Sequence, residues 1–281
     1  MFRRISTVVL VVLAVLGSLA VATAAEPKQA SGKSKSPPKE LTVDLGKGIK
    51  LELVLIPAGE FKMGRPEGDK EEAFDMWVPP QHRVRITKPF YLGKYLVTQE
   101  QWQALMGSNP SHFKGPKNPV ETVSWDDCQK FLGKLNAKVG GGAGKFQLPS
   151  EAQWEYACRA GSKTKYFFGN DETRLGDYAW YEKNSGNTTH PVGAKKPNAW
   201  GLYDMHGNVF EWSPDWWQDG YYYESPVDDP TGAATGRGRV YRGGGWNSTA
   251  RYCQSASRGG EPPGYGDSSL GLRVSRVAAD K

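Results

Sequence analysis

Apolar residues become regular from Leu41 onward and predict two strands early in the folded part of the chain. Residues 51–56 (LELVLI) are mostly apolar and end at the sequence PAG, a pattern typical of a strand followed by a turn. In residues 82–87, Val84 and Ile86 alternate with arginines, and this period of two indicates a half-buried strand.

Three helices are predicted by capping boxes, in which a hydroxyl residue accepts from a free backbone N–H and the residue three positions later reaches back. The three pairs are Thr98 with Gln101, Ser124 with Asp127, and Ser150 with Gln153. Each pair precedes a single apolar stripe, so we expect each helix to pack on a common core. The first helix is expected to stop at Gly107 and the third at Gly161.

Helical periodicity disappears after Gly161. The rest of the chain is rich in Gly, Asn, Pro and aromatic residues, and only brief extended pieces stand out, at 239–242 and 272–274. No internal repeat is visible. The pattern predicts an α+β fold, irregular and loop-rich, in a single domain over residues 41–281. Such long loops need partners for every buried N–H and C=O group.

The N-terminus indicates a targeting segment. Arg3 and Arg4 precede an apolar run at 8–20 and the small residues Ala-Thr-Ala at 22–24, so residues 1–24 are predicted to be a signal peptide. Residues 25–40 hold Pro, Lys and Ser without bulky apolar side chains and are predicted to be a disordered linker. We therefore expect an exported protein, periplasmic or secreted, or a membrane-anchored one if the leader stays uncleaved.

Charge and motif content exclude several function classes. The 36 Lys and Arg face 30 Asp and Glu, and the net charge of +6 is spread thinly without a basic stripe, so nucleic acid is not an expected partner. After the leader no apolar run approaches the roughly 20 residues that cross a bilayer. The glycine-rich segment 139–145 lacks the hydroxyl residue of a phosphate loop. The four histidines are isolated in the sequence, which disfavours a zinc site. The Gly-x-Ser-x-Gly motif of hydrolases is absent from the sequence.

An ordered series of motifs resembles the formylglycine-generating enzyme family, also called the sulfatase-modifying factors. The matching segments are 57–64, 95–98, 119–125, 148–159, 201–212, 242–247 and 270–273. The resemblance covers about residues 50–278, and so many blocks in unbroken order make it specific. It implies an irregular α+β domain related to C-type lectins.

The resemblance also implies an activity, the copper-dependent oxidation by O₂ of a sulfatase cysteine to formylglycine. The family holds Cu(I) with two cysteines separated by four residues. Counted forward from the glycines at 243–244, these positions fall on Ser248 and Cys253; counted backward from residues 270–271 through Arg258, the second falls on Ala250. The pair is incomplete either way, and a hydroxyl oxygen does not replace a thiolate on Cu(I). We therefore expect no copper and assign no catalytic residue.

Cys253 also resembles the family's structural cysteine, which implies a disulfide with Cys158. The chain has three cysteines, and the third, Cys128, shares a helix face with Leu132 and Leu135, so it is expected to be a buried apolar residue.

The family's calcium ligands match Asp204, Gly207, Val209 and Glu211. Two carboxylates at the ends of a compact loop, with backbone carbonyls between them, suit a hard dication. We expect one structural calcium ion; the alternative is that both acids are solvated loop residues.

The family's peptide groove uses a serine, a tryptophan and an arginine, where this chain has Gly245, Phe210 and Arg258. With Trp246 beside them, Phe210 and Arg258 are expected to bind an extended peptide or an exported protein such as a sulfatase; alternatively, the tryptophans fill the core. Two hypotheses follow: a non-oxidase binding or accessory member of the family, or an active formylglycine-generating oxidase.

Overall fold

The computed structural model describes residues 39–65, 81–140 and 144–277. Within them the chain forms a five-stranded sheet, a four-stranded sheet and a two-stranded ribbon. The predicted signal peptide and nearly all of the predicted linker lie outside the described residues. The linker was predicted to extend to residue 40, but Glu40 already begins the first strand.

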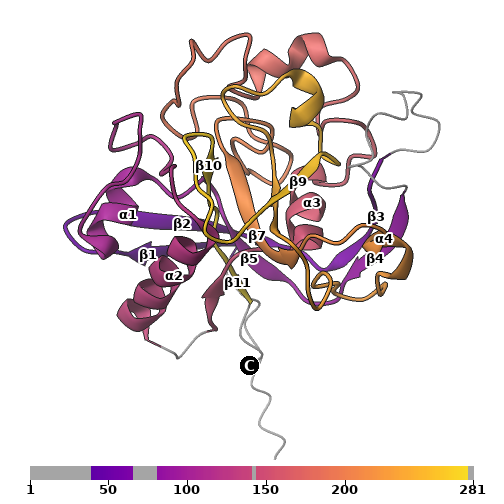
Figure 1. Cartoon of the computed structure of the whole chain (residues 1–281), viewed down its shortest axis with the longest axis horizontal. Coiled ribbons are helices and arrows are strands. Elements are labelled where there is room, and N and C mark those ends of the chain that lie inside the picture. The colour runs from indigo at the N-terminus through magenta and orange to yellow at the C-terminus, as the bar shows by residue number, and fades with distance from the viewer. Residues whose placement is uncertain (1–38, 66–80, 141–143, 278–281) are drawn as a thin grey trace, which may run out of the picture. The chain divides into compact units, whose positions relative to one another are not determined.

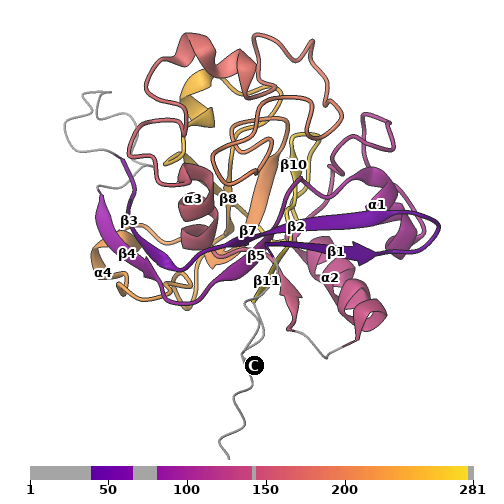
Figure 2. The same cartoon turned by 180° about the vertical axis from the view of Figure 1, so that it is seen from behind.

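The five-stranded sheet joins the two ends of the described chain. Its order is β1 (Glu40–Asp44), β2 (Lys50–Ile56), β5 (Phe90–Gly93), β11 (Ser275–Val277) and β6 (Phe146–Gln147), with antiparallel neighbours throughout. The last strand, β11, thus lies between β5 and β6 (Figures 1 and 2). The chain between β5 and β11 therefore begins and ends in the same sheet.

The four-stranded sheet includes parts of three of the segments that matched the family motifs, 201–212, 242–247 and 270–273. Its order is β10 (Leu270–Gly271), β7 (Phe210–Trp216), β8 (Arg239–Arg242) and β9 (Arg258–Glu261), with β10 parallel to β7 and the other pairs antiparallel. The ribbon pairs β3 (Gly59–Met63) with β4 (His82–Ile86). The strands predicted at 51–56, 82–87 and 239–242 are thus present. The piece at 272–274 is not a strand, because the pairing falls on β10 and β11 at either side of it.

The helices begin where the capping boxes predict. They are α1 (Gln99–Met106), α2 (Trp125–Val139), α3 (Glu151–Arg159) and the short α4 (Tyr221–Glu224), and the first three have complete capping boxes. Helix α1 ends at Gly107 as expected. Helix α3 ends one residue earlier than predicted, because Ala160 takes the left-handed conformation at φ 44° and closes the helix before Gly161. None of the helices in the described ranges has the length and apolar character of a membrane span.

Two main hydrophobic cores lie on either side of β7. Helices α1 and α2 pack beside the β1–β2 hairpin, and α3 lies on the side of β3 and β4 (Figure 1). In the first core, the Trp102 and Phe131 rings stack with centroids 5.1 Å apart, and Cys128 is fully buried among apolar residues, as predicted. The second core centres on Trp154 of α3.

Candidate functional site

A glycine-rich loop follows β8 at residues 243–245 and crosses over Cys253. Gly243 and Gly244 have φ values of 103° and 80°, which side chains rarely adopt. A Cβ on Gly244 would lie 2.7 Å from the Cys253 sulfur. Glycine is therefore required here by both backbone conformation and space, and the loop covers the cysteine.

Ser248, which the forward count places at the family's first cysteine position, stabilises a turn of this loop. Its hydroxyl accepts a hydrogen bond from the Gly245 N–H at 2.9 Å, and its own N–H donates to the Gly245 carbonyl at 3.0 Å. The residue is 6% exposed. Its oxygen thus satisfies a backbone group instead of facing a substrate.

Cys253, at the second position by the same count, is the last residue of a short 3₁₀ helix, Ala250–Cys253. It is fully buried in a small core with Tyr166 and Tyr181, and this burial raises the pKa of its thiol above the usual range. A thiol in such surroundings stays protonated and inert, whereas a copper ligand must be a thiolate. Among the described residues, no second cysteine lies at the other of these two positions.

The expected Cys158–Cys253 disulfide is not formed; all three cysteines are free thiols. Each sulfur has separate surroundings. The Cys158 thiol lies 3.7 Å from the Met205 carbonyl and 3.7 Å from the Ser255 hydroxyl, and burial raises its pKa to about 12. Cys253 instead packs under Gly244.

His206 lies between the two cysteines as a neutral ring. Its Nδ1 is 2.7 Å from the Cys253 carbonyl, to which it donates, and its Nε2 accepts from the Phe167 N–H at 3.1 Å. Burial lowers its pKa to about 3. Both nitrogens are used by the fold, so His206 is not placed to ligate a metal.

Of the two carboxylates among the expected calcium ligands, Asp204 has one oxygen without a hydrogen-bond partner in the part of the chain that the structure describes. Its backbone is left-handed, with φ 59°, and its side chain is buried. Oδ2 accepts from the Gly193 N–H at 2.8 Å, while Oδ1 is buried without a hydrogen-bond partner among the described residues. Burial raises the pKa of this carboxyl to about 6. An unsatisfied buried oxygen of this kind fits a bound cation.

Glu211, by contrast, is fully engaged. Arg273 donates to both carboxylate oxygens at 2.9 Å, and the Trp154 indole N–H donates at 2.9 Å. Glu211 and Arg273 are both completely buried. The alternative that Asp204 and Glu211 are solvated loop acids is therefore wrong. No group of three or more His, Cys, Asp or Glu side chains in the described ranges is arranged to hold a metal.

Arg258 lies in the interior, where it forms an ion pair with Glu151. Its Nε and Nη2 donate to the two Glu151 oxygens at 2.6 and 2.8 Å, and its side chain is 4% exposed. The guanidinium also packs 4.2 Å from the Trp217 ring. In this structure Arg258 is not free to bind a peptide as the resemblance implied, because its guanidinium group already contacts Glu151 and Trp217.

Phe210 and Trp246 meet at Gly245 and remain half-buried. A Cβ on Gly245 would lie 3.4 Å from the Phe210 ring, and the Trp246 indole N–H donates to the Ser268 carbonyl at 2.9 Å. The Trp246 ring packs edge-on against Phe113 with centroids 5.2 Å apart. These aromatic residues, without Arg258, form what we call the Gly245 surface: Phe113, Phe210, Gly245 and Trp246.

A buried ion network under α3 was missed from the sequence. Glu155 binds both Arg159 and Arg242, and Glu151 binds Arg258, with Arg242 3.7 Å away. Burial alone would raise the pKa of Glu155, but Arg159 and Arg242 lower it below its ordinary value. The four-residue spacing of Glu151, Glu155 and Arg159 places them on one helix face and was the available signal.

Together, the fold and the glycine-rich loop at residues 243–245 define an irregular α+β domain of the formylglycine-generating enzyme type. A family model, the sulfatase-modifying factor enzyme 1-like domain, matches residues 46–278. The chain belongs to this family, which confirms both the predicted family and the predicted fold class.

Relatives of known name are similar over much of the chain. The chaperone protein LppX of Paenibacillus barcinonensis is 30% identical over 80% of this chain and 89% of its own length. The formylglycine-generating enzyme of Streptomyces coelicolor is 34% identical over 65% of this chain and 60% of its own length. Among solved structures, Treponema denticola variable protein 1 superposes with a TM-score of 0.77 at 33% identity, covering 86% of this chain and all of its own. PvdO from Pseudomonas aeruginosa gives 0.74 at 30% identity, with the same coverage.

Proposed function

We propose that this chain is a non-oxidase binding or accessory member of the sulfatase-modifying factor family. The observation that carries the proposal is the loop over Cys253. Copper-dependent oxidation needs two accessible thiolates on one soft ion, whereas here one position is a serine bound to its own turn and the other is a protonated thiol without solvent access.

The Gly245 surface is the proposed contact for an extended peptide or an exported protein such as a sulfatase. Exposed aromatic area with nearby backbone groups is a common feature of binding surfaces. Phe210 contributes ring surface next to the edge of Gly245, and Trp246 is held in place by its bond to Ser268. The positive group that the family places in this groove is withdrawn into the interior here.

A direct test of this contact is titration of the full chain with a Cys-x-Pro-x-Arg peptide, followed by calorimetry. Trp246→Ala should weaken binding about tenfold or more, as truncation of a central aromatic anchor does. Tyr223→Ala is the matched control, because Tyr223 is 77% exposed on α4 and lies outside the Gly245 surface. Equal affinities for the wild type and Trp246→Ala would remove this assignment.

The second candidate is an active formylglycine-generating oxidase, and two observations favour it. By the forward count a cysteine occupies the second family position, and a relative of that name is 34% identical. Incubation of the full chain with Cu(I), O₂ and the same peptide, with mass spectrometry for conversion of the cysteine, separates the two. We expect the peptide to remain unmodified. Conversion by the wild type that is lost in Cys253→Ser would establish the oxidase instead.

Structural calcium is proposed as part of this function, with Asp204 and the backbone carbonyls of Gly207 and Val209 as ligands. The support is the unpartnered buried Oδ1 of Asp204 and the preference of calcium for oxygen ligands. Glu211 would contribute less than the resemblance implies, since Arg273 already neutralises it. Export is proposed from the leader-like residues 1–24 and is tested by sequencing the N-terminus of the mature protein.

A further inference from the structure

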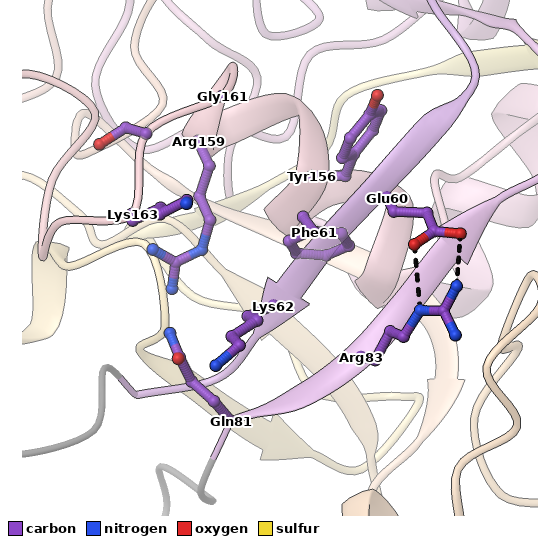
Figure 3. A pocket seen from close by; sticks show the side chains of 10 residues that line it. Glu60, Phe61, Lys62, Gln81, Arg83, Tyr156, Arg159, Gly161 and Lys163 are labelled. Carbon is purple, nitrogen blue, oxygen red and sulfur yellow. Dashed lines mark hydrogen bonds and ion pairs between the residues drawn. The ribbon is translucent and has the colours of Figure 1, made fainter.

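A cavity of about 600 Å³ opens between the β3–β4 ribbon and the end of α3, and the proposed function does not use it. Its lining mixes aromatic and basic side chains. Figure 3 shows the polar ends of Lys62, Gln81, Arg159 and Lys163 gathered on one side of Phe61, with an ion pair on the other side. A volume of this size accommodates a small organic molecule.

Lys62 and Lys163 supply positive charge to the cavity. Lys62 comes from β3 and Lys163 from the loop after α3, and both are exposed. Neither has an ion-pair partner among the residues that the structure describes. Like charges lining one cavity repel each other, so an anion between them is favoured.

Glu60, the acidic side chain in the described lining, does not neutralise these lysines. Arg83 binds both of its oxygens, at 3.0 and 2.7 Å. This ion pair lies on the opposite side of Phe61 from the lysines (Figure 3). The cavity therefore has a balanced end and a positive end.

Arg159 forms a fixed, positively charged back wall at the positive end. Its guanidinium donates to the Thr164 and Gly64 carbonyls, both at 2.9 Å, and to Glu155 at 2.8 Å. Glu155 is shared with Arg242, so the negative charge facing Arg159 is divided between two arginines. The wall thus adds positive potential without moving.

Phe61 supplies the apolar part of the cavity. It is half-buried and packs on the buried ring of Tyr156 with centroids 5.3 Å apart. Tyr156 in turn contacts Trp200 edge-on at 5.0 Å. One face of Phe61 is thereby supported from behind while the residue lines the cavity, which suits a flat apolar group.

We propose that this cavity binds an organic anion, with a phosphate or sulfate ester held by Lys62 and Lys163 and an aromatic body packed on Phe61. The two ester types share the tetrahedral anionic oxygens that ammonium groups bind. The site is separate from the Gly245 surface and needs no peptide or metal.

The test is calorimetric titration of the full chain with phenyl phosphate, phenyl sulfate, inorganic phosphate and phenol at low ionic strength. At least one phenyl ester should bind more tightly than both inorganic phosphate and phenol. Lys62→Gln with Lys163→Gln should weaken that ester about tenfold, because exposed charge pairs each contribute modestly. The control is Lys134→Gln with Lys138→Gln, which removes the same charge from exposed positions on α2 and should leave the affinity unchanged.

Phe61→Leu should reduce the preference for the phenyl ester over inorganic phosphate while leaving phosphate binding intact. All four lysines are exposed, so equal unfolding midpoints would show that folding is not at issue. The proposal is overturned if neither ester binds the wild type, if the two lysine pairs have equal effects, or if inorganic phosphate binds as tightly as the esters.

Discussion

Replacing Glu211 by Gln removes the charge that balances Arg273 and tests whether this acid is an ion-pair partner or a calcium ligand. Both side chains are completely buried. Arg273 donates two hydrogen bonds of 2.9 Å to the Glu211 carboxylate. Breaking a buried pair by removing one partner costs about 3–5 kcal/mol, because it leaves an uncompensated charge in the interior. In a domain of this size we expect the melting temperature to fall by on the order of 10 °C.

The assay is urea unfolding followed by tryptophan fluorescence, with excess calcium and with EDTA. The chain has ten tryptophans, so their combined emission reports unfolding of the whole domain. We expect Glu211→Gln to be destabilised by the same amount in both conditions. The double change Glu211→Met with Arg273→Met should cost much less than the sum of its single changes, since no charge is then left unpaired.

Two results would refute this reasoning. A loss smaller than about 1 kcal/mol in Glu211→Gln would mean that the pair does not balance a buried charge. A loss seen with calcium and absent with EDTA would show that Glu211 acts as a metal ligand, as the resemblance implied.

Three further predictions concern the neighbouring groups. Burial raises the pKa of Asp204 to about 6, so between about pH 4 and pH 6 the folded state binds a proton that the unfolded state does not. The stability of the calcium-free protein should therefore fall as pH rises through this window. In unfolding measured as a function of pH, Asp204→Asn should flatten this slope, and it should also abolish stabilisation by calcium. Ser248→Ala should cost about 1 kcal/mol, measured by urea unfolding, by leaving the Gly245 N–H unpaired; an unchanged midpoint would argue against the turn. Cys158 and Cys253 should resist a thiol reagent at pH 8 until the protein unfolds, because both thiols are fully buried and their pKa values are raised. A reducing agent should leave the melting temperature unchanged. A large drop in melting temperature on reduction would instead show that the two cysteines form a disulfide.

Local signals were sufficient for the elements whose cause is local. The caps of α1, α2 and α3 depend on a hydroxyl group and a side chain three residues later, so the sequence states them directly. Strand β7 was not predicted, because its segment FEWSPDW lacks regular alternation and contains a proline. Its strand character comes from pairing with β8 and β10.

The site residues divide in the same way. The burial of Cys128 on an apolar helix face followed from residue identity and spacing. The sequence did not show that Arg258 belongs to Glu151, because these partners lie 107 residues apart along the chain. Glu211 and Arg273 are separated by 62 residues, and no periodic pattern relates them.

By itself, the sequence determined the family, the irregular α+β fold and the three capped helices. Only the tertiary structure decided which charged side chains are available to a ligand and which form ion pairs in the interior. The physical reason is that a buried charge must find its opposite wherever the fold brings one, and residue type and spacing do not encode that choice. Arg258 and Glu211 were thereby assigned to ion pairs, whereas Lys62 and Lys163 remain at the surface around a cavity.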